Sequence, residues 1–250
     1  MIPECDMDPG ITRPVATWAV RAVIALAAVV LVGWTFQVEM LKRIAPGFVA
    51  MNPMTACGFI LAGIGLSLSM GPPQLRRWAM TCAIGVAAIG ALKLMGIISG
   101  SDVGIDQVLF RHSLDEVTSG LPNRMAPNTA LNFLLAGAAL LLLNSGRNRA
   151  RLSVDAMALT VASLSLLAII GYAYEVSALY GVRSFIAMAL HTAIAFLILA
   201  AGILCARPDN RIVALFLSDT AGGAMARKLV LPAIFLPVTI SHAAITCRTE

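Results

Sequence analysis

The side chains that most often perform chemistry are few in this sequence and are not arranged for catalysis. Of the five cysteines none forms a Cys-x-x-Cys pair, and Cys57, Cys82 and Cys205 lie inside apolar runs, where a small buried thiol is expected. The sequence has no Gly-x-Ser-x-Gly, no Walker loop, no His-Glu-x-x-His and no paired carboxylates within an apolar run. We therefore predict that these 250 residues contain no catalytic domain.

Apart from His242 in the last apolar run of the chain, His191 is the one histidine inside an apolar run. A lone histidine in a membrane segment could ligate haem or a metal. No second ligand stands three or four residues after it, so a hydrogen-bonded packing role is favoured and haem is the minor alternative. His112 does not fit a phospho-acceptor histidine, because such a site has an acidic residue directly after the His, and here Ser113 follows. No metal site and no cofactor are predicted.

Three nearly identical nine-residue segments are the most regular feature of the chain. They read MNPMTACGF at 51–59, MAPNTALNF at 125–133 and MALHTAIAF at 188–196, each at the front of an apolar run. Pro53 and Pro127 suit the first turn of a helix. Small residues such as Gly63 and Gly137 allow helices to approach closely. We expect the motif mainly to start and pack three equivalent helices.

The same segments could also line a ligand pocket. Helix N-termini carry partial positive charge, and three of them would converge if the chain closed into a bundle. The shared threonines and the polar residues near them make up the candidate pocket, with one lysine at its rim: Thr55, Lys93, Asn128, Thr129, Asn132, His191 and Thr192. Lys93 is expected to snorkel outward, or else to pair with Glu39 or Glu175.

Composition places these segments in a membrane. The chain is 59% hydrophobic and only 12% charged, with a mean hydropathy of +0.86. A soluble domain carries about 25% charged residues, so the surplus of apolar side chains must face lipid. The net charge of +5 comes from basic residues scattered through connecting loops, which argues against nucleic acid as a partner and for the lipid bilayer.

Seven stretches approach the roughly 20 apolar residues that a membrane-spanning helix needs. Between a short segment, 1–16, and a tail, 247–250, they occupy a region at 17–246, with spans at about 17–36, 50–70, 78–99, 125–145, 154–175, 184–206 and 228–246. Trp18, Trp34 and Trp78 fall at span ends, where amphipathic rings are expected. Lys and Arg are more frequent on the side of the N-terminus. The sequence therefore predicts a multi-pass inner-membrane protein with a cytoplasmic N-terminus and an external C-terminus.

The spans and the nine-residue segments together predict a repeat. Each segment begins an even-numbered span, and the span before it carries a glycine near the same end (Gly33, Gly96 and Gly171). We predict an all-α fold of three helix hairpins repeated in parallel orientation, plus a seventh helix. The loop at 100–124 is predicted to contain a short amphipathic helix on the outer interface.

Several long blocks resemble a known class of bacterial protein. They are GIDQVLFRHSL and GLPNRMAPNTALNFLLAGAALLLL, SALYGVRSFIAMALHTAIAFLILAAGILCARPD, and SDTAGGAMARKLVLPA. These blocks resemble the hydrophobic N-terminal region of PAS-containing sensor histidine kinases and diguanylate cyclases, over about residues 20–237. The resemblance implies a membrane-embedded input module, usually of eight helices, before cytoplasmic output domains. The last residues, VTISHAAITCRTE, depart from that pattern, so the chain is expected to be truncated before the output domains.

The leading hypothesis is thus a sensory input module that passes a helix shift to a cytoplasmic signalling partner, or works as a dimer with itself. A small-solute transporter or channel also suits repeats and intramembrane polar groups, although here no acidic residue lies deep in any span. A third hypothesis is a non-functional truncated remnant. The sequence does not identify the stimulus.

Overall fold

The computed structural model of the chain describes residues 9–44, 48–100, 104–109, 123–145, 150–173 and 188–207, and a few single positions after these. Every regular element in these ranges is a helix. The predicted seventh span at 228–246 and most of the predicted interfacial helix at 100–124 lie outside the described residues. The fold class is therefore all-α for the part that the structure describes.

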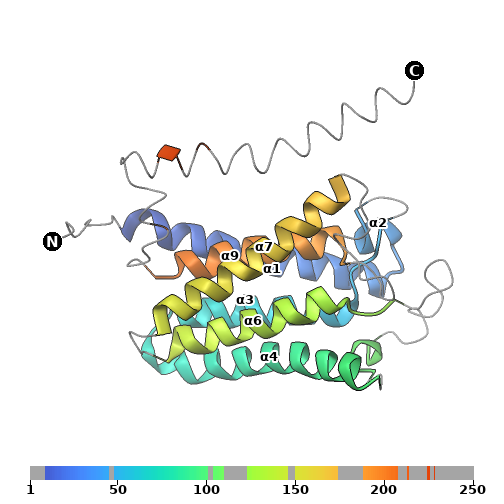
Figure 1. Cartoon of the computed structure of the whole chain (residues 1–250), viewed down its shortest axis with the longest axis horizontal. Helices are drawn as coiled ribbons and strands as arrows, with labels where there is room; N and C mark the ends of the chain where they lie inside the picture. The colour runs from blue at the N-terminus through green and yellow to red at the C-terminus, as the bar shows by residue number, and fades with distance from the viewer. Residues whose placement is uncertain are drawn as a thin grey trace.

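Within the described residues, six long helices pack together (Figure 1). They are α1 (Pro9–Thr35), α3 (Pro53–Ser69), α4 (Arg76–Ser99), α6 (Pro127–Asn144), α7 (Ala150–Ala173) and α9 (Leu190–Cys205). Three short elements join them: α2 (Glu39–Lys42) and the 3₁₀ turns η1 (Pro73–Leu75) and η2 (Ile105–Gln107).

Four of the helical segments are long and apolar enough to cross a membrane: Thr12–Thr35, Pro73–Ser99, Pro127–Asn144 and Arg151–Tyr172. They indicate a membrane protein. In contrast, α3 has 17 residues and α9 has 16. At 1.5 Å per residue these helices are about 25 Å long, which is shorter than the hydrocarbon layer of about 30 Å. The predicted spans at 50–70 and 184–206 are therefore too long as helices.

The shortening has a physical cause in the residues before each helix. Asn52, Ala126 and Ala189 have extended backbones, with φ between −62° and −65°, and they end the non-helical segment. The methionine before each of them is buried in the protein. Non-helical backbone is tolerated at membrane depth only where protein covers it. The short helices can thus begin below the end of the bundle without exposing backbone to lipid.

The six helices close into a bundle around α3, α6 and α9, which contact one another. Each of the other three packs into the groove between two of these inner helices: α1 between α9 and α3, α4 between α3 and α6, and α7 between α6 and α9. Since α1 touches both the first and the last inner helix, the arrangement is circular. Consistent with this, a third of the apolar segment of each of the helices α1, α4 and α7 is buried inside the protein, whereas half of the apolar segment of α6 is buried.

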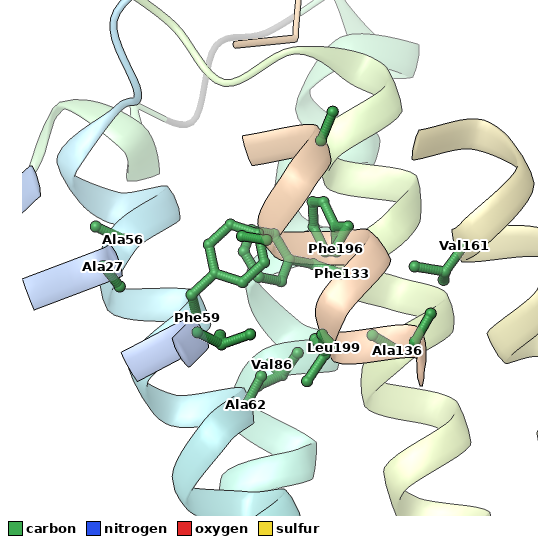
Figure 2. Packing of buried hydrophobic residues seen from close by; sticks show 14 of the residues in the cluster. Ala27, Ala56, Phe59, Ala62, Val86, Phe133, Ala136, Val161, Phe196 and Leu199 are labelled. Atoms are coloured by element: carbon green, nitrogen blue, oxygen red, sulfur yellow. The ribbon is translucent and has the colours of Figure 1, made fainter. Parts of the chain in front are cut away.

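A cluster of three phenylalanines fills the middle of the inner helices (Figure 2). Phe59, Phe133 and Phe196 are each the ninth residue of a nine-residue segment, and all three are fully buried. Their ring centroids lie 5.1, 4.5 and 4.8 Å apart, within the range of favourable tilted and edge-to-face contacts. One ring from each inner helix therefore meets the other two.

The inner helices bury the same positions. Counting each segment's Met as position one, positions 5, 6, 8 and 9 are buried in all three, and so are positions 12, 13, 15 and 16 further along each helix. Residues spaced by three and four lie on one face of a helix. Each inner helix thus turns the same wide face toward its neighbours.

The closest helix crossing joins α4 to α6. A Cβ atom on Gly90 would collide with the Ala130 carbonyl oxygen and with the backbone of Leu134, and one on Gly137 would collide with the backbone of Ala87. At Gly63 an added Cβ would lie 2.6 Å from the side chain of Ile24 on α1. Glycine at these positions lets the helices approach more closely than any larger residue would.

Candidate functional site

The starts of α3, α6 and α9 lie at the same end of the bundle as α2, at the right in Figure 1; we call it the α2 end. In α3 the Asn52 side chain caps the helix, because its Oδ1 accepts from the backbone N–H of Met54 at 2.8 Å. Ala126 and Ala189 hold the same position before α6 and α9 and make no side-chain cap. The three helix starts share a backbone shape but differ in their polar groups.

Two asparagines link the loops at this end. The Asn52 side chain donates to the Asn123 carbonyl oxygen at 3.2 Å, and the Asn123 side chain donates to the Ala50 carbonyl oxygen at 3.1 Å. The Oδ1 atom of Asn123 is buried without a hydrogen-bond partner. This reciprocal pair holds the segment before α3 against the segment before α6.

The predicted pocket residues do not all face one place. Thr55, Thr129 and Thr192 are buried in the common face, one helical turn before the phenylalanine cluster. Asn128 is only partly buried. Asn132 points to an outer helix, since its side chain donates to the Ser165 hydroxyl of α7 at 3.3 Å, and its Oδ1 has no partner. Asn132 thus shares the buried face of α6 with Thr129, and its hydrogen bond is directed to α7.

His191 lies in the first turn of α9 and is 6% exposed. Its ring lies close to the backbone carbonyl of Lys42, yet neither ring nitrogen makes a hydrogen bond. An imidazole with two unsatisfied nitrogens is costly to bury. The hydrogen-bonded packing role stays a prediction for His191, with the Lys42 carbonyl as its candidate acceptor.

Two predictions about side chains near the membrane boundary are wrong: the snorkelling of Lys93 and the interfacial position of Trp34. The alternative pairing of Lys93 with Glu175 falls outside the described residues. Lys93 is 6% exposed on the inward face of α4, so it does not snorkel to solvent. Trp34 was predicted at an interface, but it is fully buried between helices, in contrast to Trp18 and Trp78, which are both 66% exposed. Both residues follow the packing of the bundle because the outer helices turn these positions inward.

Lys42 is the centre of the α2 end, and nothing in the sequence marked it as more than a loop charge. Its side chain is 1% exposed. The Nζ atom donates to Gln37 Oε1 at 2.6 Å and to Glu39 Oε1 at 2.9 Å, and it lies 4.6 Å from the centre of the Trp34 ring. Arg43 binds the other oxygen of Glu39 at 2.6 Å. We call Trp34, Gln37 and Glu39 the ammonium box.

The Lys42 ammonium lowers the pKa of Glu39 below its usual value, chiefly through the direct hydrogen bond. The Arg43 guanidinium acts in the same direction, while partial burial of the carboxyl opposes both. The Glu39 side chain is 52% exposed, so solvent screens these charges in part. The carboxylate form therefore prevails at neutral pH.

Aromatic donors bind two of the three methionine carbonyls. The indole N–H of Trp34 donates to the Met51 carbonyl oxygen at 2.8 Å, and the hydroxyl of Tyr172 donates to that of Met188 at 2.9 Å. The sequence held a signal for this, since Trp34 follows Gly33 and Tyr172 follows Gly171, two of the three glycines that precede the nine-residue segments. The residue in the corresponding place of α4 is Ile97, which has no such donor.

The opposite end of the bundle carries basic side chains. Arg13 donates to the Met70 carbonyl oxygen at 3.2 Å and Arg207 to the Leu143 carbonyl oxygen at 2.6 Å, at the C-termini of α3 and α6. Cations at these positions satisfy free carbonyls and oppose the negative end of the helix dipole. At this end, basic side chains thus cap two of the inner helices.

Among the described residues, no group of three or more His, Cys, Asp and Glu could hold a metal ion. Comparison of the chain with protein-family models, with curated proteins and with solved structures found no match.

Proposed function

We propose that this chain is the membrane-embedded input module of a bacterial signalling protein of the histidine-kinase type. The observation that carries the proposal is the contrast within the repeated helix starts. Three inner helices share one backbone frame and one buried face, but they present Met54, Asn128 and His191 at the same place. A frame with differing polar groups at one end is what recognition of a small ligand requires.

The proposal includes the full predicted architecture: three repeated hairpins, a seventh helix, and the α2 end on the external side of the inner membrane. The circular packing of six helices and the matching burial of the inner three support the repeat. A ligand at the α2 end would act by binding two arrangements of the bundle with different affinity.

The closed core favours sensing over transport. The rings of Phe59, Phe133 and Phe196 contact one another where a solute would have to pass between the inner helices. Transport would require this cluster to open, at the expense of its ring contacts. Failure of vesicles that contain the protein to accumulate small solutes is the expected result.

A chimaera tests the signalling proposal. Residues 20–237 would replace the corresponding region of a complete sensor histidine kinase of the class that the sequence resembles, and autophosphorylation would be measured in membranes. Asn132→Leu, which removes the buried bond to Ser165, is expected to shift the kinase output by several fold without blocking insertion. Leu131→Ala, at the neighbouring and exposed position, is the matched control. Equal output from the chimaera and both variants would contradict the proposal.

A further inference from the structure

The ammonium box contains the groups that recognise an organic ammonium ion. Two oxygens, Gln37 Oε1 and Glu39 Oε1, accept from the Lys42 ammonium, and the Trp34 ring lies 4.6 Å from its nitrogen. A carboxylate supplies charge, an amide supplies a neutral acceptor, and an indole face attracts a cation that has lost its water. In the present structure the chain's own lysine occupies the box.

The walls of the box are held by bonds that do not involve the ammonium. Trp34 is fixed by its bond to the Met51 carbonyl, and Glu39 by Arg43. Gln37 lies two residues after the end of α1 and has φ of 56°, a left-handed conformation that usually requires glycine. The Val38 N–H closes this turn by donating to the Gly33 carbonyl at 2.9 Å. A non-glycine residue in this conformation is strained. Here the strained residue supplies one oxygen of the box.

The box has exposed walls at Gln37 and Glu39. Glu39 is 52% exposed, whereas the Lys42 side chain is almost completely covered. Lys42 is carried by α2, which is a single turn of four residues. A helix this short has little stability of its own, so the segment that covers the box can be displaced without unfolding a long element.

The backbone of Lys42 connects the box to two inner helices. Its carbonyl accepts from the Met51 N–H at 3.0 Å, just before α3 begins, and it lies close to the unpartnered ring of His191 at the start of α9. Displacement of Lys42 would remove one bond from the α3 start and change the surroundings of His191. Occupation of the box is therefore coupled to the positions of two helix starts.

We propose that Trp34, Gln37 and Glu39 form a binding site for organic ammonium ions, and that Lys42 is a tethered occupant which an external ammonium ligand displaces. This inference names a ligand class for the α2 end, and in that respect it rests on the proposed sensory function. The binding test below does not use a signalling output. Ammonium binding without a change in kinase output would support the site and contradict the proposed function. A signalling response without ammonium binding would support the function and contradict the site.

The first experiment empties the box in the full chain. Trp18→Phe and Trp78→Phe leave Trp34 as the one fluorescent indole, and Lys42→Ala then removes the tethered ammonium. We expect n-butylammonium chloride to change the Trp34 emission saturably in this variant, with half saturation at about millimolar concentration or below. The uncharged isostere n-butanol and sodium chloride should not reproduce the change. A tethered group competes at an effective concentration of about millimolar or more, so the chain with Lys42 should need at least about twofold more ligand.

Two matched variants test the assignment. Arg77→Ala removes an exposed cation in the first turn of α4, outside the box, and it should leave the ligand response as weak as with Lys42 in place. Glu39→Gln combined with Lys42→Ala should abolish the response. A response of equal size in all variants, or one that sodium chloride reproduces, would overturn the proposal.

A second experiment uses the unmodified protein and does not depend on how Lys42→Ala folds. An amine-reactive ester labels accessible lysines, and mass spectrometry reads Lys42 and the buried Lys93 separately. Tetramethylammonium, which cannot react with the ester, should raise the labelling of Lys42 severalfold and leave that of Lys93 constant, whereas equal sodium chloride should change neither. Labelling of Lys42 that is indifferent to tetramethylammonium would count against displacement.

Discussion

The phenylalanine cluster and the ammonium box lie in the same bundle and follow opposite rules. In the cluster, three inner helices contribute the same residue at the same position, and all atoms are apolar. In the box, one hairpin supplies Trp34, Gln37, Glu39 and Lys42, and no described part of the other two supplies a similar set. Where the three units are alike, the shared residues pack helices. Where they differ, the residues make polar contacts that helix packing does not require.

The largest expected effect tests how alike the three units are. Replacing Phe59, Phe133 or Phe196 with Ala leaves a cavity among the other two rings, and such changes cost about 3–5 kcal/mol in buried cores. We expect similar losses for the three variants, measured by denaturant unfolding in mixed micelles. The corresponding Leu variants keep most of the volume and should lose less. A loss confined to one of the three positions would break the equivalence.

The next effect concerns the α4–α6 crossing. Gly90→Ala places a Cβ atom against the Ala130 carbonyl and the Leu134 backbone, which cannot move independently of α6, so a loss near 3 kcal/mol is expected. Gly85→Ala, on the same helix, meets only the flexible end of the Leu61 side chain at 2.7 Å. It should cost less than about 1 kcal/mol, because alanine also favours the helix. Similar melting temperatures for the two variants would show that contact between the backbones of α4 and α6 does not limit how closely these helices approach.

Much of this packing could be predicted from sequence, because it depends on a short motif that occurs three times along the chain. The three nine-residue segments identify the helix starts, and Pro53 and Pro127 do stand at the first helical positions. Membrane character follows from composition alone, and four helices have the length and apolarity that it requires. The closure of the bundle could not be predicted, because it depends on which faces of α1 and α9 meet.

The polar contacts were hard to predict for a different reason. Lys42 stands in a loop between predicted spans, and a basic loop residue is ordinarily solvated. Its burial depends on the left-handed turn at Gln37, which folds α2 back over the end of α1. That conformation has no sequence signature, since glycine is the residue that usually marks it. The predictions for Trp34 and Lys93 failed for a related reason. The position of a residue along a span predicts its depth in the membrane, but not whether its side of the helix faces inward.

A smaller effect separates two hydrogen bonds that serve the same carbonyl position. Trp34→Phe leaves the Met51 carbonyl without its donor and replaces the indole beside Lys42 with a phenyl ring, which attracts a cation less strongly. We therefore expect the free energy of unfolding to fall by about 2 kcal/mol. Tyr172→Phe removes only the bond to the Met188 carbonyl and should cost about 1 kcal/mol. Unfolding midpoints of the two variants measure the difference. An equal loss would mean that the cation adds nothing to the Trp34 contact.

The smallest effect is the pH dependence of the box. The Lys42 hydrogen bond lowers the Glu39 pKa in the folded protein below its ordinary value of 4.5. A carboxyl with a lowered folded-state pKa stabilises the fold above its unfolded pKa, and that stabilisation is lost as the pH falls through the folded value. We therefore expect wild-type stability to fall below about pH 4.5 by more than that of Glu39→Gln.

The comparison between the two proteins isolates Glu39, because every other carboxyl titrates in both. Glu39 is half exposed, so screening keeps the difference small, and high salt should shrink it further. Arg43→Ala should retain most of the difference, since the Lys42 hydrogen bond is the larger cause of the lowered pKa. If instead the difference vanished in Arg43→Ala and persisted in Lys42→Met, the exposed ion pair rather than the buried ammonium would hold the carboxylate, and the box would lose its charged wall.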